Sequence, residues 1–371
     1  MYKVLSFLLY LIFFSSFVVY SFSGGDGTAL DPYEVSNCDE LQNISQIANL
    51  DDYYVLTQDI DCSGISNFQP IGSCSGSSCS TSSDDGFEGS FNGSGYVISN
   101  INIENLTTTD AGWGVFGFVE SGWIYDLGVE NIVVNVPLSP RVGGLVGDFR
   151  SGPISRVYVA GDITGGQLVG GVFGLFYSTT TDVFFIGNVT GLGGVGHIGG
   201  IAGNAGYSSI TNSYAIANIV GTTDVGGLVG RNYNNNLINS YFIGNVSGSS
   251  NVGGLVGLQD DSFDFTNSYW NNQTTNVNIT VGSGLSTGIT PIQNNYSYFL
   301  DPTREPMASW DPTIWNLTPG QLPYLQSTEN PFQSSITSTS LQAQSSSSST
   351  FPTYGILSFS FLIILLGYFF I

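Results

Sequence analysis

The sequence predicts an all-β protein: a single-stranded, right-handed parallel β-helix of about seven to eight coils with N- and C-terminal caps. Three observations predict this fold. A glycine-rich hexad recurs through the middle of the chain, and a second motif follows it at a nearly constant distance. No stretch of the middle has a 3.6-residue apolar period long enough for a helix. Each unit is too short to bury its own apolar side, so neighbouring units must stack.

The hexad sets the length of one coil. It reads VGGLVG up to Gly147 and recurs as VGGVFG, IGGIAG, VGGLVG and VGGLVG, ending at Gly174, Gly203, Gly230 and Gly257, in steps of 27, 29, 27 and 27 residues. A degenerate copy, GWGVFG, ends at Gly117. A coil of this length holds three short strands, whereas a propeller blade needs about 40–45 residues. The double glycine fits a corner where φ is positive or where backbones approach closely.

The second motif predicts which side chains stack between coils. It reads RVYVAGDITG, DVFFIGNVTG, NSYAIANIVG and NSYFIGNVSG, and residues at one phase should align at the strand spacing of about 4.8 Å. The predicted interior ladder is Leu145, Val172, Ile201, Leu228 and Leu255, and the predicted aromatic ladder is Tyr158, Phe184, Tyr214 and Tyr241. Asn212 and Asn239 should hydrogen-bond to each other. We interpret residues 87–105 and 124–136 as earlier, less regular coils.

These repeats resemble the GLUG repeat family. The pair VGGLVG and NSYAIANIVG carries the resemblance, and the flanks DPYEVSNCDELQNI, YYVLTQDIDCSG and FEGSFNGSGYVISNINI are similar to the family's N-terminal coils. The resemblance covers about residues 24–326 and implies a secreted or surface protein of adhesin type. Some members carry the repeats beside an IgA-specific metallopeptidase domain. This sequence has no H-E-x-x-H motif, so the resemblance implies no peptidase here.

Composition divides the chain into six predicted segments. They are a signal peptide (1–23), an N-terminal cap with the first coils and the disulfides (24–86), the repeat β-helix (87–270), a C-terminal cap (271–326), a Ser/Thr-rich stalk (327–354) and a hydrophobic anchor signal (355–371). The anchor favours a glycosylphosphatidylinositol (GPI) signal, with attachment at Ser345, Ser346, Ser347 or Ser348, over a short transmembrane segment. The predicted location is the cell surface, after secretion.

Two caps are expected to cover the open edges of the β-helix. Residues 39–50, with Leu41 and Ile44 on one side, have the only convincing helical period outside the targeting segments and should lie across the first coil. Residues 290–325, which include Trp310 and Trp315, should cover the far end.

Secretion favours disulfides over metal binding for the four cysteines. Cys74 and Cys79 lie in SCSGSSCS and should close a small ring, which leaves Cys38 to pair with Cys62. Nine sequons are candidate N-glycosylation sites: Asn43, Asn92, Asn105, Asn188, Asn245, Asn272, Asn278, Asn295 and Asn316.

Charge excludes several classes of partner. Six Lys and Arg against 28 Asp and Glu give a net charge of −22, which excludes nucleic-acid binding through phosphate contacts and docking to anionic lipid through a basic patch. The membrane is therefore expected as a partner only through the C-terminal anchor.

No catalytic residue, metal site or cofactor is predicted. Parallel β-helices include polysaccharide lyases, which need a strong base, and hydrolases, which need paired carboxylates. The predicted mature chain has no Lys, and its Asp pairs at 51–52, 84–85 and 260–261 are adjacent residues that would point to opposite faces of a strand. We expect His197 to be an exposed corner residue. Asp59 and Asp61 could share a calcium ion, but a capped turn is the preferred interpretation.

The sequence therefore predicts a non-catalytic cell-surface protein, an adhesin or a structural coat, that presents a rigid β-helix to an extracellular glycan or protein. One alternative is a polysaccharide-active lyase or hydrolase, which would need carboxylates from successive coils and a solvent-facing aromatic row. Another is a secreted immune-modifying factor, by analogy with the peptidase-bearing relatives.

Overall fold

A computed structural model describes residues 22–47, 50–74, 76–77, 79, 86–261, 265–271, 277–284 and 298–327. The predicted stalk beyond Ser327, the anchor segment, Ser345–Ser348, Asn272 and Asn295 lie outside these residues, as does the signal peptide before Phe22. In the described part of the chain, no helix is long and apolar enough to cross a membrane. The chain divides into residues 1–331 and 332–371, and every described residue belongs to the first unit.

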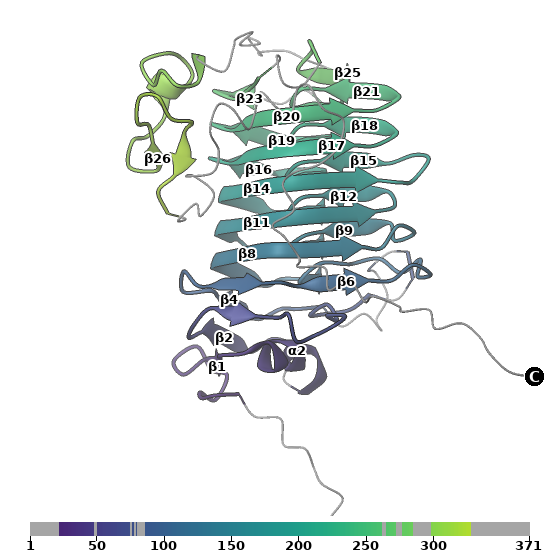
Figure 1. Cartoon of the computed structure of the whole chain (residues 1–371), viewed down its shortest axis with the longest axis vertical. Coiled ribbons are helices and arrows are strands. Elements are labelled where there is room, and N and C mark those ends of the chain that lie inside the picture. Colours follow the sequence, from purple (N-terminus) through teal and green to yellow (C-terminus); the bar gives the residue numbers. More distant parts are fainter. Residues whose placement is uncertain are drawn as a thin grey trace, which may run out of the picture. The chain divides into compact units, whose positions relative to one another are not determined.

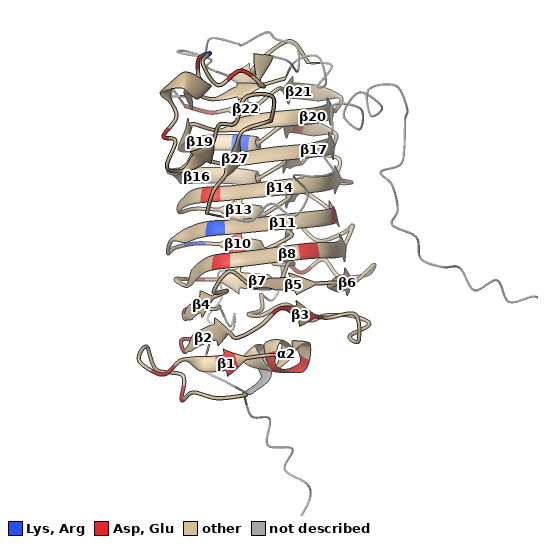
Figure 2. Cartoon of the chain, turned by 60° about the vertical axis from the view of Figure 1, so that its left-hand side comes forward, with Lys and Arg blue, Asp and Glu red and all other residues tan. Residues whose placement is uncertain are grey.

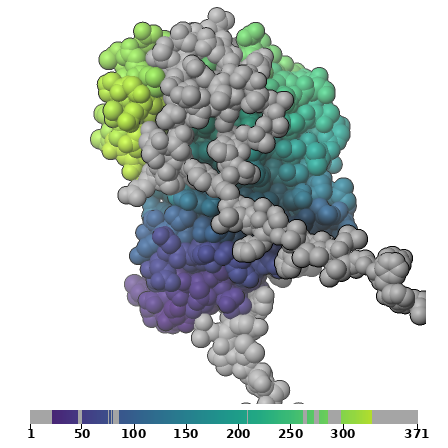
Figure 3. Space-filling view, viewed as in Figure 1, coloured from purple at the N-terminus to yellow at the C-terminus, as the bar shows by residue number. Residues whose placement is uncertain are grey.

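The described residues form a parallel β-solenoid of about six turns (Figure 1), which confirms the predicted fold class. Each turn contributes a short strand, a middle strand and a long strand, and like strands pair in parallel register from turn to turn. The space-filling view shows the turns stacked in chain order, from purple to green (Figure 3). The solenoid thus has three faces, and each residue lies beside its counterpart one turn away.

The long-strand face runs the whole length of the stack. Its strands are β1 (Tyr33–Val35), β2 (Tyr53–Leu56), β4 (Ser90–Asn92), β8 (Trp123–Asn135), β11 (Ile154–Gly165), β14 (Thr179–Gly191), β17 (Tyr214–Val220), β20 (Tyr241–Ser247), β23 (Phe265–Thr266) and β24 (Tyr269–Trp270). Three further strands, β3 (Ile60–Asp61), β5 (Val97–Ser99) and β6 (Asn102–Glu104), join it near the N-terminal end through β8.

The other two faces are built from the hexads. The middle strands are β7 (Phe116–Val119), β10 (Val146–Phe149), β13 (Phe173–Phe176), β22 (Val256–Gln259) and β25 (Val281–Gly284), together with the first halves of β16 (Ala202–Thr211) and β19 (Val229–Ile238), which continue onto the long face. The short strands are β9 (Arg141–Gly143), β12 (Leu168–Gly170), β15 (His197–Gly199), β18 (Thr223–Gly226) and β21 (Ser250–Gly253).

The expected seven to eight coils are too many. Strand β7 holds the degenerate hexad and pairs with β10, while β8 pairs with β11 in the following turn. Residues 112–136 are therefore one turn, and residues 124–136 are not a separate coil. Residues 87–105 add a partial turn, which pairs with β8 through β4, β5 and β6.

The predicted ladders are confirmed. The five interior ladder residues, Leu145, Val172, Ile201, Leu228 and Leu255, have no exposed surface. Asn239 Nδ2 donates to Asn212 Oδ1 at 3.2 Å, and the ladder extends to Asp182 on one side and Asn267 on the other. A second ladder joins Asp162, Asn188, Asn218 and Asn245, with each Nδ2 donating to the preceding Oδ1 at 2.6–3.1 Å.

The hexad glycines serve close backbone approach, and the alternative of a positive φ is wrong for them. The double glycines of the five hexads all have ordinary φ values. A Cβ at Gly227 would lie 2.3 Å from the Gly254 carbonyl oxygen of the next turn and 2.4 Å from the Phe242 ring. Positive φ instead occurs in the corner column that carries the first asparagine ladder, where Asn212 has 50° and Asn239 has 49°. Asn and Asp tolerate this conformation better than other side chains.

The N-terminal cap is the expected helix. Helix α2 (Cys38–Ile47) lies against the first strands and buries Leu41 and Ile44 completely (Figure 1). Asn37 Oδ1 accepts from the Glu40 N–H at 2.9 Å, which satisfies one free donor of the first helical turn. The predicted disulfide between Cys38 and Cys62 is present and ties the start of the helix to the solenoid.

The C-terminal segment differs from the expectation. The part within residues 298–327 contains η2 (Met307–Ser309) and the antiparallel pair β26 (Trp315–Asn316) and β27 (Tyr324–Leu325). It lies along the flank of the long-strand face in Figure 1, rather than only across the end of the stack. This flank carries a column of aromatic rings that includes Tyr241. Trp310 and Trp315 of the C-terminal segment cover these rings and remove their apolar surface from water.

Candidate binding surface

Two aromatic columns lie on the outside of the solenoid. The predicted one, which we call the aromatic ladder, takes one ring from each of the long strands β11, β14, β17 and β20, and these rings stack face to face from turn to turn. Its centroid spacings are 4.9, 4.7 and 4.8 Å between Tyr158, Phe184, Tyr214 and Tyr241, and Tyr269 and Phe299 continue it at 5.3 and 4.4 Å. Trp310 and Trp315 pack over Tyr241, whose hydroxyl donates to the Pro323 carbonyl at 2.6 Å. This column is therefore a buried attachment surface for the C-terminal segment.

The second column, the tyrosine row, was not predicted. It consists of Tyr177, Tyr207 and Tyr233 from three successive turns, with centroids 6.1 and 5.0 Å apart and rings nearly perpendicular, at 68° and 78°. The side of the row remains open, because Tyr207 is 63% exposed. A tyrosine three or four positions after the last glycine of three consecutive hexads was the available sequence signal.

A group of polar residues adjoins this row. We call His197, Asn204, Asp224, Arg231 and Asp260 the polar cluster; they come from β15, β16, β18, β19 and the residue after β22. His197 Nδ1 lies 2.7 Å from Asp224 Oδ2, and Arg231 Nε donates to Asp260 Oδ2 at 2.5 Å. Asn204 is 8% exposed, lies beside Arg231 in the parallel register, and its Oδ1 has no hydrogen-bond partner.

The cluster and the row share two strands, since β16 carries Asn204 and Tyr207 and β19 carries Arg231 and Tyr233. Burial lowers the pKa of His197 below its ordinary value despite the opposing influence of Asp224, and the charges of Arg231 and Asp260 also act on it. The hydrogen bond with Tyr207 raises the pKa of Tyr233, with further contributions from the charge of Asp261 and, least, that of Asp260. Asp260 therefore acts on both groups. The expectation that His197 is an exposed corner residue is wrong, since its side chain is only 15% exposed.

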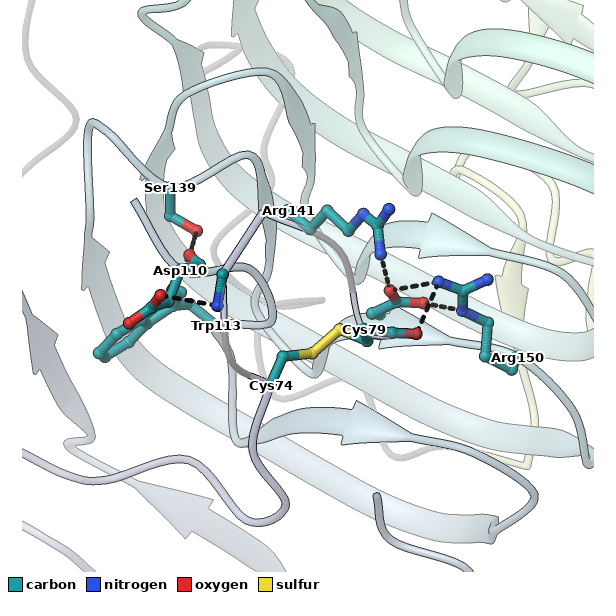
Figure 4. The surroundings of a disulfide bond; sticks show 9 residues. Cys74, Cys79, Asp110, Trp113, Ser139, Arg141 and Arg150 are labelled. Atoms are coloured by element: carbon teal, nitrogen blue, oxygen red, sulfur yellow. Dashed lines mark hydrogen bonds and ion pairs between the residues drawn. A yellow bond between two sulfur atoms is a disulfide. The ribbon is translucent and has the colours of Figure 1, made fainter. Parts of the chain in front are cut away.

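A buried ion triad lies at the N-terminal side of this surface. Asp148 is fully buried and contacts both Arg141 Nη1 and Arg150 (Figure 4). Arg150 Nε donates to Asp148 Oδ1 at 2.6 Å, and Arg150 Nη2 donates to Asp148 Oδ2 at 3.0 Å. Arg150 Nη2 also donates to the Cys79 carbonyl at 3.3 Å, and its guanidinium lies 5.7 Å from the Tyr177 ring centroid. Through Arg150 the triad therefore holds Cys79 in place and contacts Tyr177 of the tyrosine row.

The four cysteines form the two predicted disulfides, Cys38 with Cys62 and Cys74 with Cys79. The sulfurs of the second pair lie within 4.8 Å of Asp148, an arrangement with the spacing of a metal site. Both sulfurs are used in the disulfide, so they are not free to act as thiolate ligands. This bridge fastens a surface loop.

The remaining predicted positions lie apart from this surface. Asp59 Oδ1 accepts from the Val97 N–H at 2.9 Å, and Asp61 accepts from Ser63 and Asn100, which agrees with a capped turn. Among the sequons, Asn278 is exposed, and the other described ones are half-buried: Asn43, Asn92, Asn105, Asn188, Asn245 and Asn316. All five arginines of the described chain pair with aspartates, and charged residues are sparse over the turns in Figure 2.

The stacked turns and their hexads define the chain as a glycine-rich β-solenoid with GLUG-type repeats. A family model of the GLUG motif matches residues 221–247, which are the turn from β18 to β20, and this confirms the resemblance. A crystal structure described as a candidate immunoglobulin A1 protease from Bacteroides ovatus superimposes with a TM-score of 0.59 and 20% identity, covering 83% of this chain and 96% of that one. At that identity the likeness shows the fold alone.

Two curated relatives match part of the chain. Halomucin of Haloquadratum walsbyi is 32% identical over 163 residues, which are 42% of this chain and 2% of halomucin. A protein described as a Gly-rich membrane protein from Evansella cellulosilytica is 31% identical over 145 residues, which are 37% of this chain and 15% of that protein. The chain thus spans a small fraction of either relative. Both names belong to surface or membrane proteins.

Proposed function

We propose that this protein is a non-catalytic cell-surface protein that binds an extracellular glycan or protein through the outer surface of its solenoid. The tyrosine row carries the proposal. Tyrosine offers a rigid apolar ring with a polar tip, so a mostly exposed Tyr207 between the half-buried Tyr177 and Tyr233 favours binding over packing. Three tyrosines on successive turns match an extended partner, and the polar cluster beside them supplies directional contacts.

The two relatives support the location. Their names, a mucin and a membrane protein, are consistent with a protein displayed outside the cell. The predicted signal peptide at residues 1–23 and the predicted anchor at residues 355–371 would deliver and hold the chain there. If the surface has a ligand, the protein acts as an adhesin. If it has none, the protein acts as a structural coat.

A polysaccharide-active enzyme is the second candidate. The observation that favours it is the solvent-facing aromatic row beside Asp224 and Asp260, which come from successive turns. Asp260 is paired with the Arg231 cation, and Asp224 accepts from Asn251 Nδ2 beside the neutral His197. Carboxylates held in this way suit holding a ligand better than transferring protons. Incubating the protein with a polysaccharide panel and measuring new reducing or unsaturated ends tests this candidate, and turnover would replace binding as the function.

Binding of the full-length protein to arrayed glycans, matrix proteins and whole cells tests the proposal. We expect saturable binding that soluble protein competes, and a loss of at least about tenfold in affinity for Tyr207→Ala, because contact aromatics carry large shares of binding energy. Tyr96→Ala is the matched control, since Tyr96 is also exposed but lies on the N-terminal partial turn. Absence of binding to every surface, or equal losses in both variants, would favour a passive coat.

A further inference from the structure

Asn204 is a buried polar side chain in a mixed column of the middle strands, which also holds Asp148, Leu175, Arg231 and Leu258. In the parallel register it lies between Leu175 of the preceding turn and Arg231 of the following turn, and Leu258 occupies the position after that. Leu175 is 3% exposed, so a leucine packs well at this place in the repeat. Asn204 instead buries an oxygen that has no hydrogen-bond partner. A buried unsatisfied acceptor destabilises a fold, so its presence calls for a partner.

The surroundings of Asn204 define the chemistry of that partner. Arg231, the cation of the polar cluster, is paired with Asp260, and Asp224 lies against His197, which burial keeps neutral near pH 7 by lowering its pKa. No cation in this cluster is left over for a carboxylate or a sulfate, and a net charge of −22 repels polyanions. The neighbouring tyrosine row offers aromatic rings to an apolar sugar face. A neutral molecule rich in hydroxyl groups satisfies all of these groups.

We infer that the outer surface recognises a neutral glycan, with Asn204 Oδ1 accepting a hydrogen bond from a sugar hydroxyl while the sugar ring lies against the tyrosine row. This inference rests on the proposed binding function and names its ligand class. Oδ1 is shielded from solvent in the structure, so binding includes a turn of the Asn204 amide. The side chain turns outward as a whole, so that Oδ1 and Nδ2 both face the sugar hydroxyls, which donate and accept.

The test separates the ligand role of Asn204 from a structural role. In full-length Asn204→Leu we expect the thermal midpoint to rise, because an unsatisfied acceptor is replaced by the residue type found one turn away. Affinity for neutral glycans should fall by at least about tenfold. Asn212→Leu is the matched control: it removes ladder bonds on the long-strand side, so its midpoint should fall while binding per folded molecule is retained. Asn204→Ser, which keeps an acceptor, should lose less binding than Asn204→Leu.

The probes are neutral glucans, mannans and galactans against polygalacturonate and chondroitin sulfate of similar length. Wild-type binding to acidic chains in preference to neutral ones would overturn the inference and point to the surplus positive charge of Arg141 and Arg150 around Asp148. Unchanged neutral-glycan binding in Asn204→Leu, or a lower midpoint, would also overturn it while leaving the proposed function intact. If the wild type binds neither class of glycan nor any protein, the proposed function itself fails.

Discussion

The aromatic ladder and the tyrosine row are built from the same residue types on the same repeat, yet they behave in opposite ways. Ladder rings are nearly parallel, for example 3° between Tyr214 and Tyr241, and both are fully buried. Row rings meet edge to face, and Tyr207 is mostly exposed. The ladder has a partner in the chain itself, the segment with Trp310 and Trp315, whereas among the described residues Tyr207 of the row stays mostly exposed.

This difference teaches that repetition alone does not separate structure from function. In a solenoid any residue type placed at one phase forms a column, since the backbone register aligns it. What distinguishes the columns is whether the chain supplies a cover. A covered column contributes to folding, while an uncovered one is available to a partner from outside.

The largest expected effect breaks the covered column. Tyr241→Ala removes stacking on both sides and the hydrogen bond to the Pro323 carbonyl, so the free energy of unfolding should fall by about 3–5 kcal/mol. Urea unfolding followed by tryptophan fluorescence measures it, because Trp310 and Trp315 report on the ladder. A loss below about 1 kcal/mol would mean that the ladder is not a structural column.

A somewhat smaller loss of stability is expected from a substitution at a hexad glycine. Gly227→Val places a side chain against Phe242 and the Gly254 carbonyl, so it should cost about 1–3 kcal/mol or more through overpacking. Gly194→Val is the control, because a Cβ at Gly194 meets nothing within 4 Å. Equal thermal midpoints for the two variants would contradict the assignment of the hexad glycines to close approach.

A pH effect sharpens the description of the uncovered surface. Because the folded-state pKa of His197 is lowered, the unfolded chain takes up the proton first. The stabilising contribution of neutral His197 is therefore present above its unfolded pKa of about 6.5 and declines as the pH falls below that value. Thermal midpoints measured from pH 7.5 to 5 should fall for the wild type and fall less for His197→Gln. Parallel curves would show that His197 does not titrate against Asp224, Arg231 and Asp260.

The smallest effect on stability belongs to the uncovered column. Tyr207→Ala should change the free energy of unfolding by no more than about 0.5 kcal/mol, because most of this side chain is already in water. The same urea titration used for Tyr241→Ala measures it. A loss comparable to that of Tyr241→Ala would erase the distinction between the two columns and remove the reason for placing a ligand on the row.

The sequence predicted the features that recur in successive turns. The fold, the interior and aromatic ladders, the asparagine ladder and both disulfides follow from periodicity and from short cysteine spacing. The coil count was too high because a degenerate hexad and the long strand after it belong to one turn. Sequence period alone cannot show which face a degenerate segment joins.

The candidate binding surface was missed for a physical reason. The residue types vary from turn to turn: Tyr207 follows its hexad by four positions instead of three, and Asn204 lies in a column with Leu175 on one side and Arg231 on the other. His197 and Asp224 come together only because strands one turn apart align them. The burial of His197 depends on neighbours from several turns, which no local pattern of the chain reveals.

The asparagine ladders have a consequence for how the chain can be modified. Asn188 and Asn245 lie in sequons, but their Nδ2 atoms donate to Asp162 and Asn218 across the turns. A sugar joined to either nitrogen would take the place of one of its hydrogens and add bulk between rungs. In Asn92 and Asn105 it is Oδ1 that accepts the turn hydrogen bonds, from the N–H groups of Ser94 and Thr107. Glycans are therefore expected on the irregular N-terminal turns, while the regular turns keep their amides for one another.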